Sequence, residues 1–358
     1  MASSRPVRGA TLNVESKRFH LPQREANGDW LDARDDLDGA PSPVRTTVTV
    51  EKAKTIISRN TSPDVPFDRS INPYRGCEHG CIYCFARPSH AFHDLSPGLD
   101  FETKLFAKPT AAELLRAELS KPGYTCTPMA MGTNTDPYQP IEGEWRITRG
   151  VIEVLAECDH PLVITTKSDR VVRDIDLLAP MAAKGLAVVA ISVTSLIPKI
   201  AMTIEPRAPH PERRLTAVRR LADAGVPVFV NMAPVIPAIT DGEIEEVVGR
   251  AAESGALGVS FIPVRLPWEV APLFRAWLDE HFPERAGKVR ATIQSLRGGR
   301  DNDPNFGSRM RGQGPWAELL RTRFLLARKR HGIDRNSEKM RLRTDLFHPP
   351  RGSQGELF

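Results

Sequence analysis

Three cysteines lie close together in the segment Cys77–Cys84, with the spacing C-x3-C-x2-C. Three thiolates on a short loop that contains glycine can bind three of the four irons of a [4Fe–4S] cluster, because full ligation by protein needs four cysteines. The fourth iron is then open, and the amino and carboxylate groups of S-adenosylmethionine (SAM) can bind there. Reduction of such a cluster can cleave SAM and release a 5′-deoxyadenosyl radical, while the protein supplies positioning and excludes water.

A structural zinc site is the alternative interpretation of these cysteines. It would combine them with His79, His90 or His93. The spacing C-x3-C-x2-C is unusual for zinc, however, and no second C-x2-C pair follows it. The other two cysteines, Cys126 and Cys158, are isolated and are expected to be small buried hydrophobic residues. An odd count of five cysteines in a chain of this size favours metal ligation over a disulfide framework.

The composition is that of an ordinary globular protein, with 41% hydrophobic and 26% charged residues among 358. The longest nearly apolar stretch, Leu186–Ile197, is too short to span a bilayer. The first residues lack the apolar run of a signal peptide, so we expect a cytoplasmic protein without a membrane partner. The net charge of +5 permits an anionic partner but does not establish one.

Short apolar runs alternate with amphipathic helical patterns from residue 70 to residue 264. Such an alternation predicts an α/β protein with a parallel sheet covered by helices. About six strand–helix units suit a partial (β/α)6 barrel of TIM type, and a doubly wound open sheet is the alternative. Thr110 and Asp241 are expected to cap two of the helices. The expected strands are 70–72, 129–132, 162–166, 186–193, 226–232 and 257–264, and the expected helices are 110–119, 146–158, 173–183, 211–224 and 241–254.

Four regions are expected along the chain. Residues 1–46 are expected to be a flexible N-terminal extension or an arm that follows the surface. The barrel is expected to span 47–265. A helical region packed on the barrel and closing its mouth is expected at 266–332, with a Gly- and Arg-rich loop at 298–314. A polar tail is expected at 333–358.

Seven segments between Ser58 and Gly332 resemble the radical SAM superfamily, specifically its branch of spore photoproduct lyase-like and DNA-repair-photolyase-like proteins. This resemblance implies a barrel of the radical SAM kind, a [4Fe–4S] cluster, SAM and an external electron donor of flavodoxin or ferredoxin type. The matching segments are SINPYRGCEHGCIYCFARPSH, GTNTDPYQPIEGEWRITRG, ITTKSDRVVRDIDLL, ISVTS, EPRAPHPERRL, APVIPAITDGEIE and VRLPWEV.

The resemblance also implies roles for individual residues. The expected cluster ligands are Cys77, Cys81 and Cys84. Tyr83 is similar to the aromatic residue whose backbone meets the SAM adenine, and in this branch it is a candidate catalytic relay of a hydrogen atom. The remaining expected SAM contacts are Gly132, Thr133, Asn134 and Thr135 at the amino group, Lys167 at the carboxylate, and Ser192 and Thr194 on the next strand.

Two differences from spore photoproduct lyase limit which of the lyase's residue roles can be expected in this chain. The lyase has a cysteine hydrogen donor on its second strand, where this chain has Thr133 or Asn134. The tyrosine after its third cluster cysteine is replaced here by Phe85. We therefore expect a lyase-like radical SAM enzyme whose substrate is damaged or modified nucleic acid, but not intact machinery for reversing thymine dimers. A peptide or small metabolite is the alternative substrate, and a non-catalytic nucleic-acid-binding protein with a metal cluster is the alternative class.

Other segments carry weaker signals. The basic residues between Arg285 and Arg330 could contact phosphates or form a solvated helix face. Arg207 could bind an anion or form a structural ion pair, and the segment 136–142 could line a cavity or merely connect two elements. The last residues, Gln354–Phe358, resemble the short peptides by which bacterial repair proteins bind the sliding clamp.

Overall fold

The structure is a computed structural model that describes residues 8–14, 16, 18, 45–333 and 341–350. Its main sheet has seven strands in the order β10-β9-β8-β7-β6-β3-β2. Strands β3, β6, β7, β8, β9 and β10 are parallel, and β2 pairs antiparallel with β3. The strands are β2 (Ile57–Arg59), β3 (Arg69–Ile71), β6 (Met129–Met131), β7 (Leu162–Thr166), β8 (Ala187–Ser192), β9 (Val228–Val235) and β10 (Val259–Pro263).

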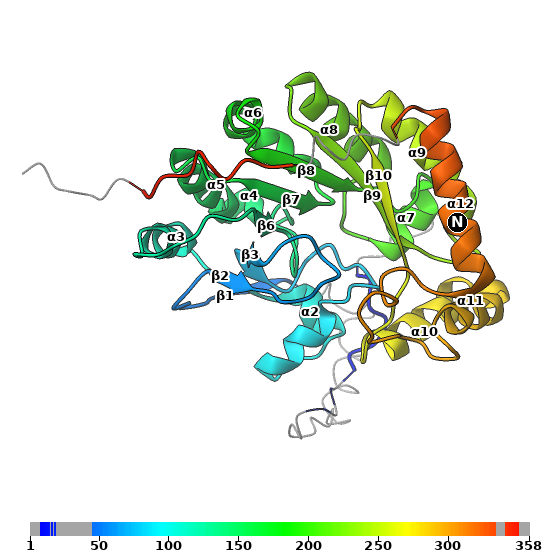
Figure 1. Cartoon of the computed structure of the whole chain (residues 1–358). Helices are drawn as coiled ribbons and strands as arrows, with labels where there is room; N and C mark the ends of the chain where they lie inside the picture. The colour runs from blue at the N-terminus through cyan, green and yellow to red at the C-terminus, as the bar shows by residue number, and fades with distance from the viewer. Residues whose placement is uncertain (1–7, 15, 17, 19–44, 334–340, 351–358) are drawn as a thin grey trace, which may run out of the picture.

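Helices cover the outer side of this curved sheet (Figure 1). Six parallel strands, with β2 and β10 as the edges of the sheet in the described part of the chain, confirm the predicted partial barrel. The covering helices are α3 (Ala111–Leu119), α5 (Ile147–Glu157), α6 (Ile175–Ala183), α8 (Pro211–Asp223) and α9 (Ile244–Glu253). Shorter helices are η1 (Arg87–His93), α4 (Glu142–Trp145), η2 (Asp169–Asp174), α7 (Pro198–Ile204) and η3 (Asp241–Glu243).

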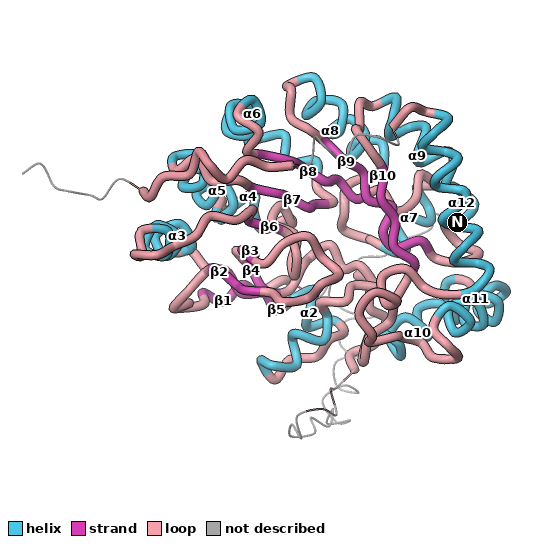
Figure 2. The backbone as a smooth tube through the Cα atoms, viewed as in Figure 1, coloured by secondary structure: helices cyan, strands magenta, loops and turns pink. Residues whose placement is uncertain are grey.

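The strands read as apolar runs because both of their faces are buried. All six residues of β8 are buried, and Val189, Ile191 and Val230 belong to one hydrophobic core with side chains of the covering helices. Burial of apolar surface at about 25 cal/mol per Å² makes this core the main stabilising term of the barrel. Figure 2 shows loops inside the arc of strands and the helix α2 below it.

A second, three-stranded sheet was not predicted from the sequence. Its order is β1-β5-β4, and its strands are β1 (Thr47–Val50), β5 (Lys104–Ala107) and β4 (Tyr74–Arg75). The helix α2 (Leu99–Thr103) leads directly into β5. These strands are only two to four residues long, and their burial follows no single pattern, so they leave no apolar run or clear alternation in the sequence.

The C-terminal helices lie beside the barrel. They are α10 (Val270–His281), α11 (Pro283–Leu296) and α12 (Gly314–Arg330). Helices α10 and α11 share a hydrophobic cluster with Ile82 and Tyr83 of the cysteine segment, whereas α12 packs on α9 and stacks Phe324 on Phe261. The loop 298–314 reaches the β2–β3 connection, where the Gly307 amide donates to Asp64 over 2.6 Å. This loop therefore joins the two edges of the main sheet.

The described parts of both terminal segments pack on the barrel region. Within the predicted N-terminal extension, Ala10 is buried, which fits the surface arm rather than the flexible extension for these residues. Within the predicted tail, the Arg343 amide donates to the Gly185 carbonyl and the His348 amide donates to the Cys158 carbonyl. The clamp-binding peptide predicted at 354–358 lies outside the described residues.

The expected helix caps are wrong in detail. Thr110 precedes α3 but its side chain makes no capping hydrogen bond. Asp241 lies within η3, because the chain makes a 3-10 turn before α9 begins. The predicted helices of the barrel begin and end within three residues of their expected limits, and η2 takes the first two residues of the predicted helix 173–183. Within the described residues, no helix is long and apolar enough to cross a membrane.

Candidate active site

The three cysteines of the motif lie on one loop that follows β3 and β4. Cys77 and Cys81 are 7% and 6% exposed, and Cys84 is half-buried. The Cys77 amide donates to the Phe101 carbonyl over 3.0 Å, and the Ile82 amide donates to the Ile204 carbonyl over 3.1 Å. These bonds attach the loop to α2 on one side and to the end of α7 on the other.

Arg87 fixes the middle of the cysteine loop from within the protein. Its side chain is fully buried, and its guanidinium donates to backbone oxygens and to one carboxylate. Sequence reasoning did not identify this role, although Arg87 follows the motif directly. The acceptors are the carbonyls of Gly80, Cys81, Pro97 and Gly98 and the carboxylate of Glu102.

Glu102 joins the same network from α2. Besides the ion pair with Arg87, it accepts hydrogen bonds from the amides of Gly9 and Ala10 over 2.9 and 2.8 Å. The loop passes so close to this carboxylate that a Cβ on Gly80 would lie 2.8 Å from it. Gly80 also has φ of +67°, so glycine is required there for two reasons.

The segment after β6 holds the start of the cysteine loop. The Thr135 hydroxyl donates to the Gly76 carbonyl over 2.6 Å, and the Gln139 side-chain amide donates to the same oxygen over 3.2 Å. Gln139 also accepts from the Glu78 amide over 2.9 Å. Thr135, predicted as a SAM contact, thus also bonds to the loop, and Gln139 is a positioning residue that the sequence did not reveal.

The other residues predicted at the SAM amino group lie beside the end of β3. The Asn134 amide donates to the Asn72 side chain over 2.9 Å, and the Thr133 hydroxyl lies 3.2 Å from the same side chain. Gly132 has φ of +88°, and a Cβ there would meet the Thr165 carbonyl at 2.0 Å. Gly132 therefore allows β6 to end in close contact with β7.

Asp136 connects the ends of β6 and β7 to the cysteine loop. Its carboxylate accepts from the Thr166 hydroxyl and the Lys167 amide, and it lies 3.3 Å from the His79 ring. Burial alone would raise the pKa of Asp136, but His79 and these hydrogen bonds lower it below its usual value. Asp136 is therefore a charged anchor that fixes the backbone of Lys167.

Lys167 lies between the cysteine loop and the residues of β8. Its Nζ is 5.8 Å from the centre of the Tyr83 ring. Burial opposes its charge, but the neighbouring Cys81 and Glu205 raise the pKa of Lys167 above its usual value. A fixed positive charge is thus present where a substrate or cofactor carboxylate could bind.

Tyr83 faces a buried carboxylate that sequence reasoning did not assign to the site. Its hydroxyl donates to Glu205, which also accepts from Thr194 over 2.7 Å. Arg214 of α8 pairs with Glu205 at 2.5 Å and donates to the Ser192 carbonyl over 3.1 Å. Burial and Glu205 raise the pKa of Tyr83 well above its usual value, so the phenol keeps its proton.

Three thiolates on one short loop can bind three irons of a cluster. Burial raises the pKa of Cys81 to about 12 in the metal-free protein, Glu205 and Cys84 add to this increase, and Lys167 opposes it. The histidines of the zinc alternative have other partners. His90 bonds to the Lys104 carbonyl, and His93 packs on Phe106 at 4.8 Å. Within the described residues, no three His, Cys, Asp or Glu groups are arranged to hold a single metal ion.

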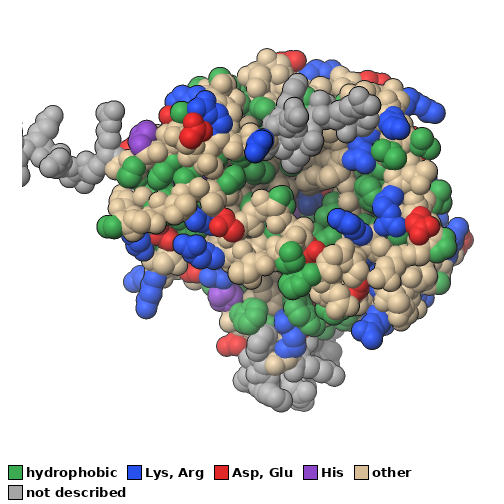
Figure 3. Space-filling model, viewed as in Figure 1, with side chains coloured by type: hydrophobic (Ala, Val, Ile, Leu, Met, Phe, Trp, Pro, Cys, Tyr) green, Lys and Arg blue, Asp and Glu red, His purple; other side chains and the backbone are tan. Residues whose placement is uncertain are grey.

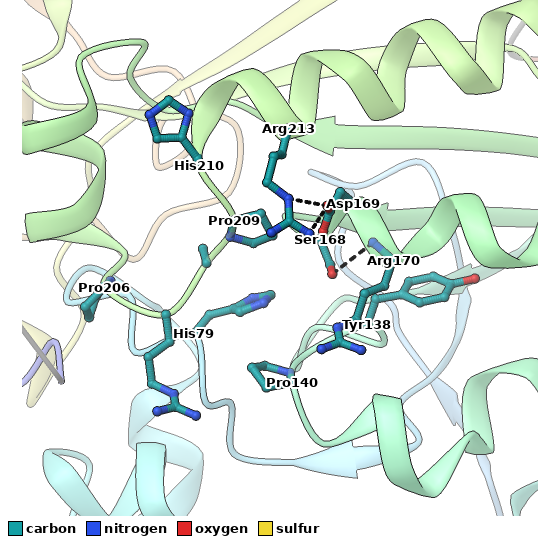
Figure 4. Close-up of a pocket in the computed structure, with 12 residues that line it drawn as sticks. His79, Tyr138, Pro140, Ser168, Asp169, Arg170, Pro206, Pro209, His210 and Arg213 are labelled. Carbon is teal, nitrogen blue, oxygen red and sulfur yellow. Dashed lines mark hydrogen bonds and ion pairs between the residues drawn. The ribbon is translucent and has the colours of Figure 1, made fainter. Parts of the chain in front are cut away.

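A pocket of about 490 Å³ opens outside this network, between the cysteine loop and the segments that follow β6, β7 and α7. His79, Tyr138 and His210 line it, and Figure 4 shows Arg213 reaching from the start of α8 to Asp169. That ion pair is 2.6 Å long. The segment 136–142 thus both lines a cavity and anchors the cysteine loop. Arg207, considered earlier as an anion ligand, forms an ion pair with Glu78 at 3.1 Å.

Comparison with protein families gives a match to the radical SAM superfamily over residues 71–251. The chain belongs to this superfamily, whose members use a [4Fe–4S] cluster and SAM, and it is a radical SAM enzyme. An uncharacterized protein of Mycobacterium tuberculosis is 38% identical over 228 residues, which cover 63% of this chain and 67% of that protein. An uncharacterized protein of Methanocaldococcus jannaschii is 25% identical over 234 residues, covering 65% and 83% of the two chains.

A solved structure of spore photoproduct lyase, complexed with dinucleoside spore photoproduct, has a similar fold. It gives a TM-score of 0.55 at 16% identity and covers 88% of this chain and 85% of that chain. A mutant of the same lyase, also with dinucleoside spore photoproduct, gives a TM-score of 0.52 at 16% identity and covers 80% of this chain and 79% of that chain. At this level of identity the likeness concerns the fold, and it agrees with the six-stranded partial barrel described above.

Proposed function

We propose that this radical SAM enzyme acts on damaged or modified nucleic acid and holds its cluster on Cys77, Cys81 and Cys84. The observation that carries the proposal is that the Lys167 ammonium lies near Cys81 and Cys84 of this loop. They meet at the carboxyl ends of the parallel strands, where barrel enzymes build their active sites. A cluster held by these cysteines would supply the electron for the reductive cleavage of SAM.

The chain's own residues position the cofactors and exclude water. Arg87 and Gln139 fix the backbone of the cysteine loop, and Asp136 fixes that of Lys167. Lys167 offers a compact positive charge to the SAM carboxylate. Tyr83 offers a phenol whose orientation is set by Glu205 and which is the candidate hydrogen relay. Ser192, Thr194 and the segment Gly132–Thr135 remain proposed SAM contacts.

Charge and fold together favour nucleic acid as the substrate. The net charge is +5, and the chain shares its fold with an enzyme whose solved structure is complexed with a dinucleoside photoproduct. Not every basic residue of the C-terminal region can serve this purpose. Arg290 pairs with Asp279 and Arg323 with Glu245, so these two belong to a mixed, solvated helix surface.

Anaerobic turnover tests the radical step. The cluster is reconstituted, SAM and dithionite are added, and 5′-deoxyadenosine is followed by chromatography. Wild type and Cys126→Ala should form it, because Cys126 lies outside the motif, whereas Cys81→Ala should not. Formation by Cys81→Ala, or none by wild type that holds a complete cluster, would contradict the proposed site. A reduced flavodoxin or ferredoxin is expected to replace dithionite.

Lesion-bearing DNA and RNA test the substrate. The expected result is a change in the yield of 5′-deoxyadenosine together with a new mass in the oligonucleotide. No mass change in any nucleic acid, together with one in a peptide or small metabolite, would instead favour the alternative substrates.

A further inference from the structure

Four aromatic side chains on the surface of the described residues are more than half exposed. They are Phe85 at 51%, Phe92 at 68%, Trp268 at 66% and Phe306 at 59%. Large aromatic side chains usually contribute to a protein core, because each buries much apolar surface. Several exposed rings in one region therefore indicate a surface that binds something.

Each of these rings has an arginine over it. The Arg265 guanidinium lies 5.5 Å from the Phe85 ring centre, and Arg309 lies 4.4 Å from that of Phe306. Arg18 lies 4.6 Å from Trp268 and also 6.0 Å from Phe92. Such pairs hold flat cationic groups against the rings at the surface.

The four rings belong to one continuous surface. Phe85 and Phe92 lie on the segment that follows the third cysteine, and Trp268 lies on the loop after β10. Arg18 joins this loop to that segment at one end, and Arg265 joins them at the other. Arg265 also contacts Met310 at 3.1 Å, in the loop that carries Phe306. We call Phe85, Phe92, Trp268 and Phe306 the aromatic surface.

Two further features mark this surface. Trp268 has φ of +45°, a strained backbone conformation for a bulky residue, and such strain gathers at functional sites. Phe85 is the residue directly after Cys84, so the surface begins at the proposed cluster. Hydrophobic and basic side chains also adjoin one another in the lower half of the face in Figure 3.

We propose that the aromatic surface binds unstacked bases of a single-stranded or locally opened nucleic acid and leads that strand to the active site. This inference rests on the proposed function and specifies the form of its substrate. Aromatic rings bind bases of any sequence by stacking, and arginines add contacts to phosphates and to base planes. Enzymes that act on a base need it out of the duplex, which a platform beside the cluster would favour.

The charge of the region agrees with an anionic ligand. Burial and the nearby Arg309 lower the pKa of Arg265, and Asp64 offsets only part of this effect. Asp64 neutralises Arg309, with which it forms an ion pair, whereas the Arg265 guanidinium contacts the sulfur of a methionine. A phosphate placed here would offset more of the effect on Arg265.

Fluorescence anisotropy with the reconstituted full chain tests the inference. The probes are a labelled single strand of about 15 nucleotides and the duplex of the same sequence. Wild type should prefer the single strand. Trp268→Leu and Phe306→Leu should each weaken its binding about tenfold, because leucine keeps apolar area but cannot stack on a base. Trp268→Phe should recover most of the affinity, and Leu326→Ala, an exposed position on α12, should bind as wild type does.

Formation of 5′-deoxyadenosine without nucleic acid should be the same in all of these variants. If wild type binds the single strand but both leucine variants bind equally well, the inference about this surface is wrong and the proposed substrate class survives. Equal affinity for strand and duplex would also overturn it. If wild type binds neither probe even at low salt, the proposed nucleic-acid substrate itself fails.

Discussion

Replacing Arg87 by methionine is expected to lower the free energy of unfolding by about 3–5 kcal/mol, because it leaves a buried carboxylate without its cationic partner. Arg87 and Glu102 are both fully buried, so water cannot substitute for either one. Glu102 would keep the amides of Gly9 and Ala10 as donors, which limits the loss. The carbonyls of the cysteine loop lose donors as well, at about 1–3 kcal/mol for each group left unsatisfied.

Urea unfolding of the cluster-free protein measures this cost. Arg116→Met is the matched control, because Arg116 forms a partly exposed ion pair with Glu157 whose loss should cost about 1 kcal/mol or less. A double variant, Arg87→Met with Glu102→Gln, should lose less than the sum of the two single changes, since it removes both charges. Iron bound after reconstitution should also fall in Arg87→Met and remain normal in Arg116→Met.

A cost for Arg87→Met no larger than that of the control would refute the reasoning. So would strict additivity in the double variant. Either result would mean that the cysteine loop keeps its conformation without this ion pair and that the network around it is not what positions the thiols.

Three further changes test other parts of the site and fold. Gly132→Ala should destabilise the protein by at least about 2 kcal/mol through the clash with Thr165 and the positive φ, whereas Gly287→Ala, in open space on α11, should be neutral or slightly stabilising in the same urea assay. Lys167→Gln should weaken SAM binding about tenfold or more by calorimetry while iron content stays normal, and unchanged affinity would remove Lys167 from the SAM site. Burial lowers the pKa of His160 to about 4, so its stabilising contribution is complete above the unfolded pKa of about 6.5 and is lost as pH falls toward 4. Wild type should therefore lose about 2 kcal/mol of its free energy of unfolding between about pH 7 and about pH 5 because of His160. His160→Asn should not show this part of the loss, and parallel pH profiles of the two proteins would contradict this.

The barrel strands and the cluster motif could be predicted because their signals are local. β7 spans the predicted residues 162–166, and the other barrel strands lie within three residues of their expected limits. Burial on both faces forces such strands to be apolar throughout, whatever their neighbours are. The C-x3-C-x2-C spacing is likewise a property of one short segment.

The ion pairs that position the site could not be predicted in the same way. Glu205 lies 122 residues from Tyr83 and meets it only because the end of α7 and the cysteine loop converge. The local sequence pattern of neither segment predicts this contact. The small β1-β5-β4 sheet was missed for a related reason, since pairs of two to four residues depend on tertiary contacts rather than on propensity.

The sequence by itself determined the parallel strand–helix order and the identity of the proposed cluster ligands, because burial periodicity and ligand spacing act over a few residues. Only the tertiary structure decided which buried charges pair, which residues hold the cysteine loop, and that four exposed rings from distant segments form one surface. Those outcomes depend on contacts between residues up to about 250 apart in the chain, such as Arg18 with Glu269, which a linear pattern does not encode.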